Sequence, residues 1–287
     1  MTASPANDIR LAGNSLSLMA SSTMDVEVEA MRPGRVVGVG GGAPTASGTD
    51  VHVRWTFRVG ADPPTAWSWR DRGAPPLDQL TPVRRPRSSE YNRHVPVAAY
   101  TVTNGDFVSL ESGLERDLVR RLDRDQTVRR IVAQPLTLSW SGSEPGNHTP
   151  DLLSVHADDA PTVWDVRALD KQDQHFDVRS ALTRQACTLV GWCYEIFAGM
   201  DDLERLNMMW LNGFRRAPPW ADRLEERIYA AAGCDGATLA SVFAHDDGSG
   251  ELISTVWHLL WRGALHIDVT APWTPATAVT PGIGAYR

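Results

Sequence analysis

The sequence predicts an α/β fold with a mixed sheet, followed by a smaller helical region. Leu110, Leu114, Leu118 and Leu122 recur at every fourth position, which is the spacing of an apolar stripe on one helix. Three strand patterns, a second helical pattern and a last strand follow this helix. Helix, three strands, helix and strand in this order are typical of an α/β core with a mixed sheet.

The strands are predicted from alternating or short apolar runs. Residues 51–59 alternate apolar and polar side chains, and residues 95–102 also have a strand pattern. After the first helix, strands are expected at residues 128–140, 152–155 and 162–167. The last two should form a hairpin across Ala157-Asp158-Asp159, and a helix at 174–190 and a strand at 192–197 complete the core.

The character of the sequence changes after residue 200. Helices are expected at residues 203–214, 220–232, 238–243 and 251–261, followed by a strand at 264–269 and a returning strand within 272–279. Short helices followed by a β-wing suggest a winged-helix-like domain. We therefore expect a flexible leader over residues 1–50, rich in Gly, Ser, Ala and Pro, a core domain over 51–200 and a helical domain over 201–287.

Composition limits the classes of partner. The 287 residues carry a formal net charge of −7, so no global field attracts this chain to nucleic acid. DNA binding would need a local basic patch, and Arg84-Arg85-Pro-Arg87 with Arg93 is the candidate.

The cysteines and the hydropathy pattern bear on the cellular location of the protein. Cys187, Cys193 and Cys234 have no zinc-like spacing, so buried, reduced thiols are expected. No uncharged run approaches the ~20 residues of a membrane span, and no signal-peptide pattern opens the sequence. We expect a cytoplasmic protein without a membrane partner.

Three acidic residues are candidates for a metal site. Asp151 opens one predicted strand and Asp165 lies in the next, so the two carboxylates converge if these strands pair. Glu115 lies at the edge of the apolar stripe of the first helix and could complete the cluster. Carboxylate oxygens suit Mg²⁺ or Mn²⁺. The alternative, equally open at this point, is a set of unrelated surface carboxylates.

Two basic residues follow the second aspartate. Arg167 shares a strand face with Asp165, and its planar guanidinium can stabilise charge on a phosphate but cannot act as a base. Lys171 is the single lysine of the chain, and it either reaches the same site or is a solvated surface charge. Glu, Pro-Asp and Asp-x-Arg in this order form the layout of a PD-(D/E)xK metal-dependent nuclease with its lysine replaced.

Several motifs together resemble the actinobacterial TnsA-like transposase endonuclease subunits, from about residue 84 to 270. The motifs are Arg84 to Arg93, Tyr100-Thr-Val-Thr-Asn-Gly-Asp, Leu110-Glu-Ser-Gly-Leu-Glu115-Arg-Asp, Gln134-Pro135, His148-Thr-Pro-Asp151, Val163-Trp-Asp-Val-Arg167, Cys187-x4-Trp192, Trp210-Leu-x-Gly-Phe-Arg215 and His258-Leu-Leu-Trp-Arg-Gly263.

The resemblance implies a restriction-endonuclease-like PD-(D/E)xK core that is Mg²⁺- or Mn²⁺-dependent and acts on DNA. It further implies cleavage at the 5′ ends of a transposon, while a TnsB-like transposase cuts the 3′ ends and a TnsC-like AAA+ ATPase contacts the C-terminal part.

Residue by residue, Glu115, Asp151 and Asp165 match the metal-binding positions of the family, and Arg167 matches the lysine position. Some family members look to carry Gln in place of Asp165, and Arg in place of Lys is the larger departure.

Gln134, in the Gln-Pro motif, and His148 are expected to support the site, and Lys171 remains a candidate for the role of the missing lysine. Two alternatives to an active transposition nuclease stay open. One is a catalytically inactive adaptor that binds a transposase or ATPase, and the other is a stand-alone defence nuclease.

Overall fold

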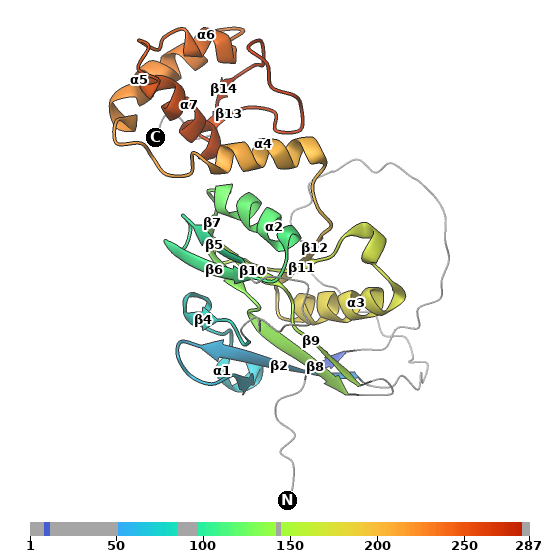
Figure 1. Cartoon of the computed structure of the whole chain (residues 1–287). Helices are drawn as coiled ribbons and strands as arrows, with labels where there is room; N and C mark the ends of the chain where they lie inside the picture. The colour runs from blue at the N-terminus through green and yellow to red at the C-terminus, as the bar shows by residue number, and fades with distance from the viewer. Residues whose placement is uncertain (1–8, 12–50, 85–96, 142–144, 283–287) are drawn as a thin grey trace, which may run out of the picture.

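The chain folds into a mixed α/β structure with a helical C-terminal part (Figure 1). The computed structural model describes residues 9–11, 51–84, 97–141 and 145–282. Most of the predicted leader, residues 85–96 with Arg85, Arg87 and Arg93, and residues 142–144 lie outside these ranges. No helix within the described ranges is long and apolar enough to cross a membrane.

The first sheet is built around the long strand β2 (Val51–Val59). β2 pairs antiparallel with β1 (Ile9–Leu11), β3 (Thr65–Trp67), β4 (Leu80–Thr81) and β8 (Leu136–Ser141), and β8 pairs with β9 (Gly146–His148). Between β3 and β4 the chain forms the short helices α1 (Trp69–Arg72) and η1 (Leu77–Gln79).

The second sheet has the strand order β12-β11-β10-β7. Its strands are β7 (Val128–Ala133), β10 (Leu152–His156), β11 (Pro161–Val166) and β12 (Cys193–Phe197). β12 runs parallel to β11, and the other neighbours are antiparallel. Since parallel neighbours need a crossover, η2 (Leu169–Lys171) and α3 (Gln174–Leu189) connect β11 to β12.

Helix α2 (Gly113–Arg124) and a hairpin of β5 (Val97–Thr101) and β6 (Asp106–Leu110) complete this half of the molecule. Ser112 caps α2, because its side chain accepts a hydrogen bond from the backbone N–H of Glu115. The predicted order of helix, three sheet strands, helix and strand is present as α2, β7, β10, β11, α3 and β12, with β8 and β9 inserted after β7.

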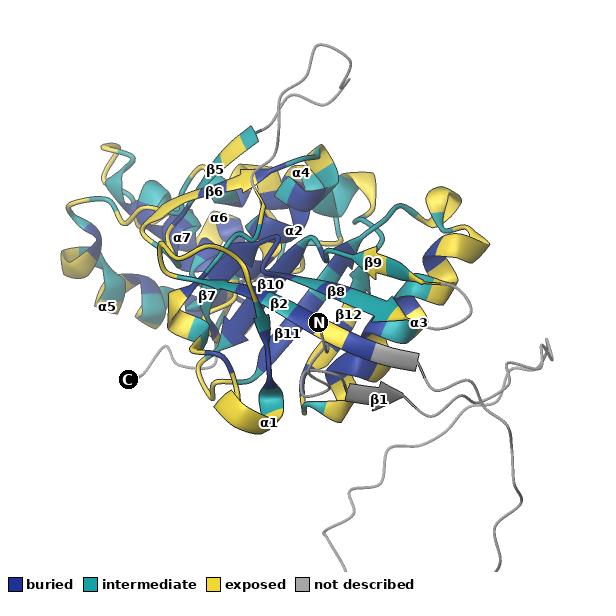
Figure 2. Ribbon diagram, turned by 90° about the horizontal axis from the view of Figure 1, so that it is seen from below, coloured by how far each residue is buried: buried dark blue, intermediate teal, exposed yellow. Residues whose placement is uncertain are grey.

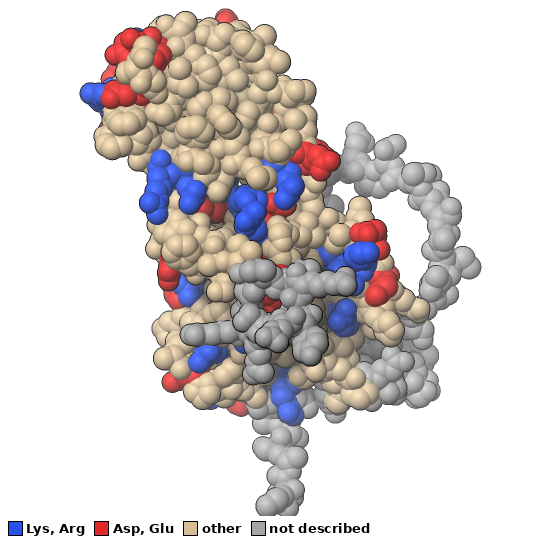
Figure 3. All heavy atoms as spheres, in the orientation of Figure 1, with Lys and Arg blue, Asp and Glu red and all other residues tan. Residues whose placement is uncertain are grey.

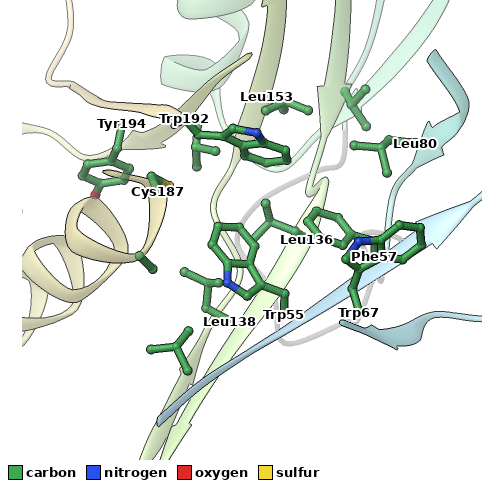
Figure 4. Packing of buried hydrophobic residues seen from close by; sticks show 14 of the residues in the cluster. Trp55, Phe57, Trp67, Leu80, Leu136, Leu138, Leu153, Cys187, Trp192 and Tyr194 are labelled. Carbon is green, nitrogen blue, oxygen red and sulfur yellow. The ribbon is translucent and has the colours of Figure 1, made fainter. Parts of the chain in front are cut away.

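Two apolar cores lie on the two sides of the second sheet. One fills the space between the sheets and α3 and includes Trp55, Phe57, Leu153, Trp192 and Tyr194 (Figure 4). The other packs under α2, with Leu118, Leu122, Ile131, Leu152 and Phe197 among its members. The strands β10 and β11 are therefore buried on both faces, and Figure 2 shows them among the most buried parts of the chain.

The C-terminal part has its own core. It contains α4 (Asp202–Asn212), α5 (Ala221–Ala232), α6 (Leu239–Phe243) and α7 (Glu251–Trp261), followed by β13 (Leu265–His266) and β14 (Thr280–Pro281). Buried Leu211, Ile228, Val256 and Leu259 pack together here. The helices agree with the prediction. The pair β13–β14 is only two residues long on each side, and β14 follows the range 272–279 in which the returning strand was expected, so the expected wing is wrong in both length and position.

The C-terminal part meets the core where α4 lies against α2 (Figure 1). Asp117 of α2 is buried between Arg120 and Arg205, and Arg205 Nε lies 2.7 Å from its carboxylate. Basic side chains gather on one face along this boundary (Figure 3). An ion pair with one buried partner thus contributes to the contact between the two parts.

The prediction of one strand over residues 128–140 is wrong. The structure breaks this segment at Gln134 (φ 45°), and β7 and β8 belong to different sheets. A residue before proline is restricted, and non-glycine residues rarely adopt this left-handed conformation, so the break is a constrained turn. Apolar residues lie on both sides of the turn, Ile131 to Ala133 before it and Leu136 and Leu138 after it, which is why the strand pattern did not reveal it.

Two other expectations need correction. Leu110 was counted in the helical stripe, but it ends β6, because the capped helix begins only at Gly113. The three cysteines are free as expected, but only Cys187 is buried, while Cys193 and Cys234 are exposed. Cys193 occupies an outward position on β12, where exposed and buried side chains alternate.

Candidate acidic site

Asp151 lies at the start of β10, where its side chain extends the pairing with β11. Its backbone N–H donates to the Trp164 carbonyl (3.0 Å), and its Oδ2 accepts a hydrogen bond from the backbone N–H of Val166 (2.7 Å). At the end of the β10–β11 ladder, the Asp151 carboxylate therefore accepts a hydrogen bond of the kind that a backbone carbonyl accepts within the ladder. This contact ties Asp151 to the strand that carries Asp165.

Burial raises the pKa of Asp151 from 3.8 to about 8. The hydrogen bond from Val166 acts in the opposite direction, and the negative charges of Asp165, Glu115 and Glu111 raise the pKa further. Asp151 thus interacts electrostatically with both other predicted ligands. A half-buried carboxyl group among like charges is stabilised by a proton or by a cation.

Glu115 lies in the first turn of α2 and is buried. Its carboxylate accepts hydrogen bonds from the Ser112 hydroxyl (2.8 Å) and from the backbone N–H of Glu111 (2.9 Å). Burial raises the pKa of Glu115, and the nearby charge of Glu111 adds to this effect. Part of the role of Glu115 is therefore helix capping, which holds the carboxylate in one orientation.

Asp165 is buried on β11, on the side that faces the first sheet. His148 Nε2 of β9 lies 2.8 Å from both carboxylate oxygens, and the Tyr194 hydroxyl of β12 donates to Oδ2 at 2.6 Å. Burial and the neighbouring Asp165 charge raise the pKa of Tyr194, so the phenol remains a proton donor. Both oxygens of Asp165 are therefore engaged within the protein.

Gln134, expected to support the site, holds Asp151 through its backbone. Its N–H donates to the Asp151 carbonyl (2.8 Å), and its own carbonyl accepts from Val83 N–H (2.9 Å). The side chain is buried, and its Oε1 has no hydrogen-bond partner among the described residues. A strained backbone and an unsatisfied buried oxygen beside Asp151 are typical of functional sites.

Arg167 and Lys171 are joined by a hydrogen bond from the Arg167 side chain to the Lys171 backbone. The Arg167 Nε donates to the Lys171 carbonyl (2.7 Å), and the Arg167 N–H donates to the Phe197 carbonyl (3.0 Å). The Lys171 side chain is 66% exposed and pairs with Asp170 at 3.3 Å. The side-chain contacts of these two residues therefore involve the turn after β11, and none of them joins the carboxylates of the site within the described part of the chain.

The structure brings Asp151 within electrostatic reach of both Glu115 and Asp165. Within the ranges that the structure describes, no group of three or more His, Cys, Asp or Glu side chains is arranged to hold a metal ion. Mg²⁺, however, commonly uses one or two carboxylates and completes its shell with water and substrate phosphate. Asp151 and Glu115 are the candidate donors, because burial raises the pKa of both carboxyl groups and a cation would offset the cost of burying their charges.

Two contributors were missed by the reasoning from sequence. Glu111 acts on both Asp151 and Glu115, and its position four residues before Glu115 was a signal that could have been used. The Tyr194 hydroxyl donates a hydrogen bond to Asp165, and only the parallel pairing of β11 with β12 brings these two residues together.

In comparisons by sequence, no protein-family model and no curated protein gave a match to this chain.

Proposed function

We propose that this chain is a metal-dependent DNA endonuclease subunit of a transposition machine, and that it hydrolyses phosphodiester bonds at the 5′ ends of a transposon. The observation that carries the proposal is the position of Asp151 at the end of the β10–β11 ladder, where its carboxylate accepts from Val166 N–H and burial and the charges of Asp165 and Glu115 raise its pKa. Strongly shifted carboxyl groups cluster at functional sites, where they hold cations or exchange protons.

The topology supports a restriction-endonuclease-like PD-(D/E)xK core. α2, β7, β10, β11, α3 and β12 follow the helix, three strands, helix, strand order of that core. In this arrangement the Pro150-Asp151 pair opens the central strand β10, and Asp165-x-Arg167 spans the end of its neighbour.

Asp151 and Glu115 would hold the Mg²⁺ or Mn²⁺. The bound ion would supply an activated water and neutralise charge on the phosphate oxygens. Asp165 is a positioning residue in this scheme, because its hydrogen bonds to His148 and Tyr194 fix the end of β11, where Val166 N–H holds Asp151. To reach the scissile phosphate, the Arg167 guanidinium would give up its hydrogen bond to the Lys171 carbonyl and donate to the phosphate oxygens instead. The guanidinium stays charged in both contacts.

A second candidate, a catalytically inactive adaptor, is favoured by two of these contacts. Asp165 is fully engaged by His148 and Tyr194, and Arg167 is bonded to the Lys171 carbonyl. Under this proposal the chain binds its TnsB-like transposase and TnsC-like AAA+ ATPase partners without cutting DNA.

A nicking assay on a transposon-end DNA, with the chain reconstituted with both partners and Mg²⁺ or Mn²⁺, distinguishes the two candidates. The decisive variant is Asp151→Asn, and the matched control is Asp158→Asn, which makes the same change in the exposed turn between β10 and β11. We expect Asp151→Asn to reduce 5′-end cleavage at least about a hundredfold, because a lost metal ligand removes several kcal/mol of transition-state stabilisation. The control should cut normally. Cleavage by Asp151→Asn at the wild-type rate would place the active site elsewhere, and no 5′-end cleavage by the wild-type complex would favour the adaptor.

A further inference from the structure

A groove with a volume of about 700 Å³ runs alongside β4, β6 and β7. Three arginines line it, Arg58 from β2, Arg84 after β4 and Arg130 from β7, whereas Asp106 is the one carboxylate among its lining residues. The groove is therefore locally positive, although the whole chain has a net charge of −7. A polyanion is the class of ligand that fits this charge.

Each of these guanidinium groups has donors to spare. Arg58 Nε donates to the Asp62 carbonyl, and Arg130 donates one Nη to the Leu80 carbonyl, while its buried Nε has no partner among the described residues. Arg84 pairs with Glu111 at 3.3 Å, but its side chain remains 55% exposed. A guanidinium carries five N–H donors, so these contacts leave donors of Arg58 and Arg84 for phosphate oxygens.

An exposed aromatic ring completes the groove. Phe107 of β6 lines it and is 63% exposed, the second most exposed large hydrophobic side chain among the described residues. Tyr100 of β5 contacts this ring edge-on, with a centroid distance of 5.5 Å and an interplanar angle of 74°. The ring is thus held in place without being part of a core.

The groove borders a residue that contacts the acidic site. Gln134 is one of its lining residues, and the Gln134 N–H donates to the Asp151 carbonyl. Arg84 pairs with Glu111, whose charge acts on both Asp151 and Glu115. A ligand that reaches Gln134 in the groove therefore contacts a residue that is hydrogen-bonded to Asp151.

We propose that this groove binds one unpaired strand of DNA, with phosphates on Arg58, Arg84 and Arg130 and a base stacked on Phe107, and that it guides this strand to the acidic site. A basic track with an exposed aromatic ring is the arrangement that binds single strands, since every unpaired base offers a face for stacking. A duplex keeps its bases stacked on one another and cannot use Phe107 in this way. The inference rests on the proposed function and specifies the form of its substrate.

Binding of a fluorescent single-stranded oligothymidine, measured by anisotropy in EDTA over a salt series, tests this inference without cleavage. We expect Phe107→Ala to weaken binding roughly fivefold to a hundredfold and Phe107→Trp to preserve it, because stacking is the contact that changes. Arg58→Gln with Arg84→Gln should reduce the slope of log K against log salt by about 0.7 for each lost phosphate contact. Both substitutions affect side chains with solvent exposure, and thermal unfolding verifies that the variants remain folded.

Leu206→Ala, which truncates an equally exposed apolar side chain on α4, and Arg223→Gln, which removes an exposed charge on α5, are the matched controls and should bind like the wild type. The inference is overturned if Phe107→Ala binds like these controls, or if Phe107→Ala weakens binding to a blunt duplex of the same length as strongly as to the single strand. Either result leaves the nicking assay unaffected. Conversely, an inactive nuclease that still shows the Phe107 effect would retain the strand-binding groove and lose only the proposed chemistry.

Discussion

His148 Nε2 lies 2.8 Å from both carboxylate oxygens of Asp165, and this contact joins β9 of one sheet to β11 of the other. Asp165 is 2% exposed, so its charge depends on hydrogen bonds inside the protein. The pair therefore has a structural role whatever its part in catalysis.

His148→Ala should lower the free energy of unfolding by about 1–3 kcal/mol, because it leaves a buried carboxylate with one fewer donor. Urea unfolding followed by circular dichroism measures this loss. His175→Ala, at an exposed position in the first turn of α3, is the control and should have little effect. Equal unfolding midpoints for His148→Ala and the wild type would show that Asp165 does not depend on His148.

Asp151 should make stability fall as the pH rises. Its folded-state pKa of about 8 lies above the ordinary value of 3.8, so between these values the folded protein binds more protons than the unfolded chain. The favourable contribution is complete below pH 4 and is lost as the pH rises through 8, with a total on the order of 5 kcal/mol. Asp151→Asn removes this dependence, so its melting temperature should exceed that of the wild type by an increasing margin from pH 5 to pH 8. A margin that stays constant with pH would contradict the raised pKa.

Mg²⁺ should reverse the same destabilisation. At pH 8 a bound cation compensates the charges of Asp151 and Glu115, and any ligand that binds only the folded state stabilises it. We expect a rise in melting temperature with Mg²⁺ or Mn²⁺ for the wild type and for Asp158→Asn, but not for Asp151→Asn or Glu115→Gln. The same rise in all four proteins would indicate cation binding elsewhere.

Arg167 and Lys171 can be separated by substitution. If Arg167 stabilises the phosphate, Arg167→Ala should lose most of the cleavage activity, Arg167→Lys should retain or increase it, and Lys171→Ala should be nearly silent, as expected for a side chain that is 66% exposed. Cleavage rates of the reconstituted complex measure this. The reverse pattern would assign the catalytic charge to Lys171.

Asp117 should be important for the contact between α2 and α4. It lies buried between Arg120 and Arg205, and the Arg120 side chain is only 11% exposed. Asp117→Ala leaves that guanidinium without its partner and should destabilise the protein by about 3 kcal/mol, since removing one member of a buried pair is costly. Differential scanning calorimetry measures the loss, and Asp222→Ala, at an exposed position of α5, is the control. A melting temperature like that of the control would mean that Arg120 finds another partner.

The sequence by itself determined most of the helices and the central hairpin. α3, α5 and α7 begin and end close to the predicted residues, because apolar spacing and capping groups act within one or two turns of a helix. The hairpin of β10 and β11 was predictable for the same reason, since two short apolar runs flank a polar turn. The break at Gln134 was not, because apolar residues with a strand pattern lie on both sides of it, in β7 and in β8.

For the candidate site too, the sequence determined one part and the tertiary structure decided the other. The sequence indicated Glu115, Asp151 and Asp165 as acids that adjacent elements would carry toward one another, and the pairing of β10 with β11 places Asp151 beside the strand of Asp165. Only the tertiary structure decided that His148 and Tyr194 occupy the oxygens of Asp165 and that Arg167 bonds to the Lys171 carbonyl. The periodicity of the sequence shows which face of a helix or strand is buried. The hydrogen-bond partners of a buried charge, however, come from segments that are distant in the sequence and meet only in the folded chain.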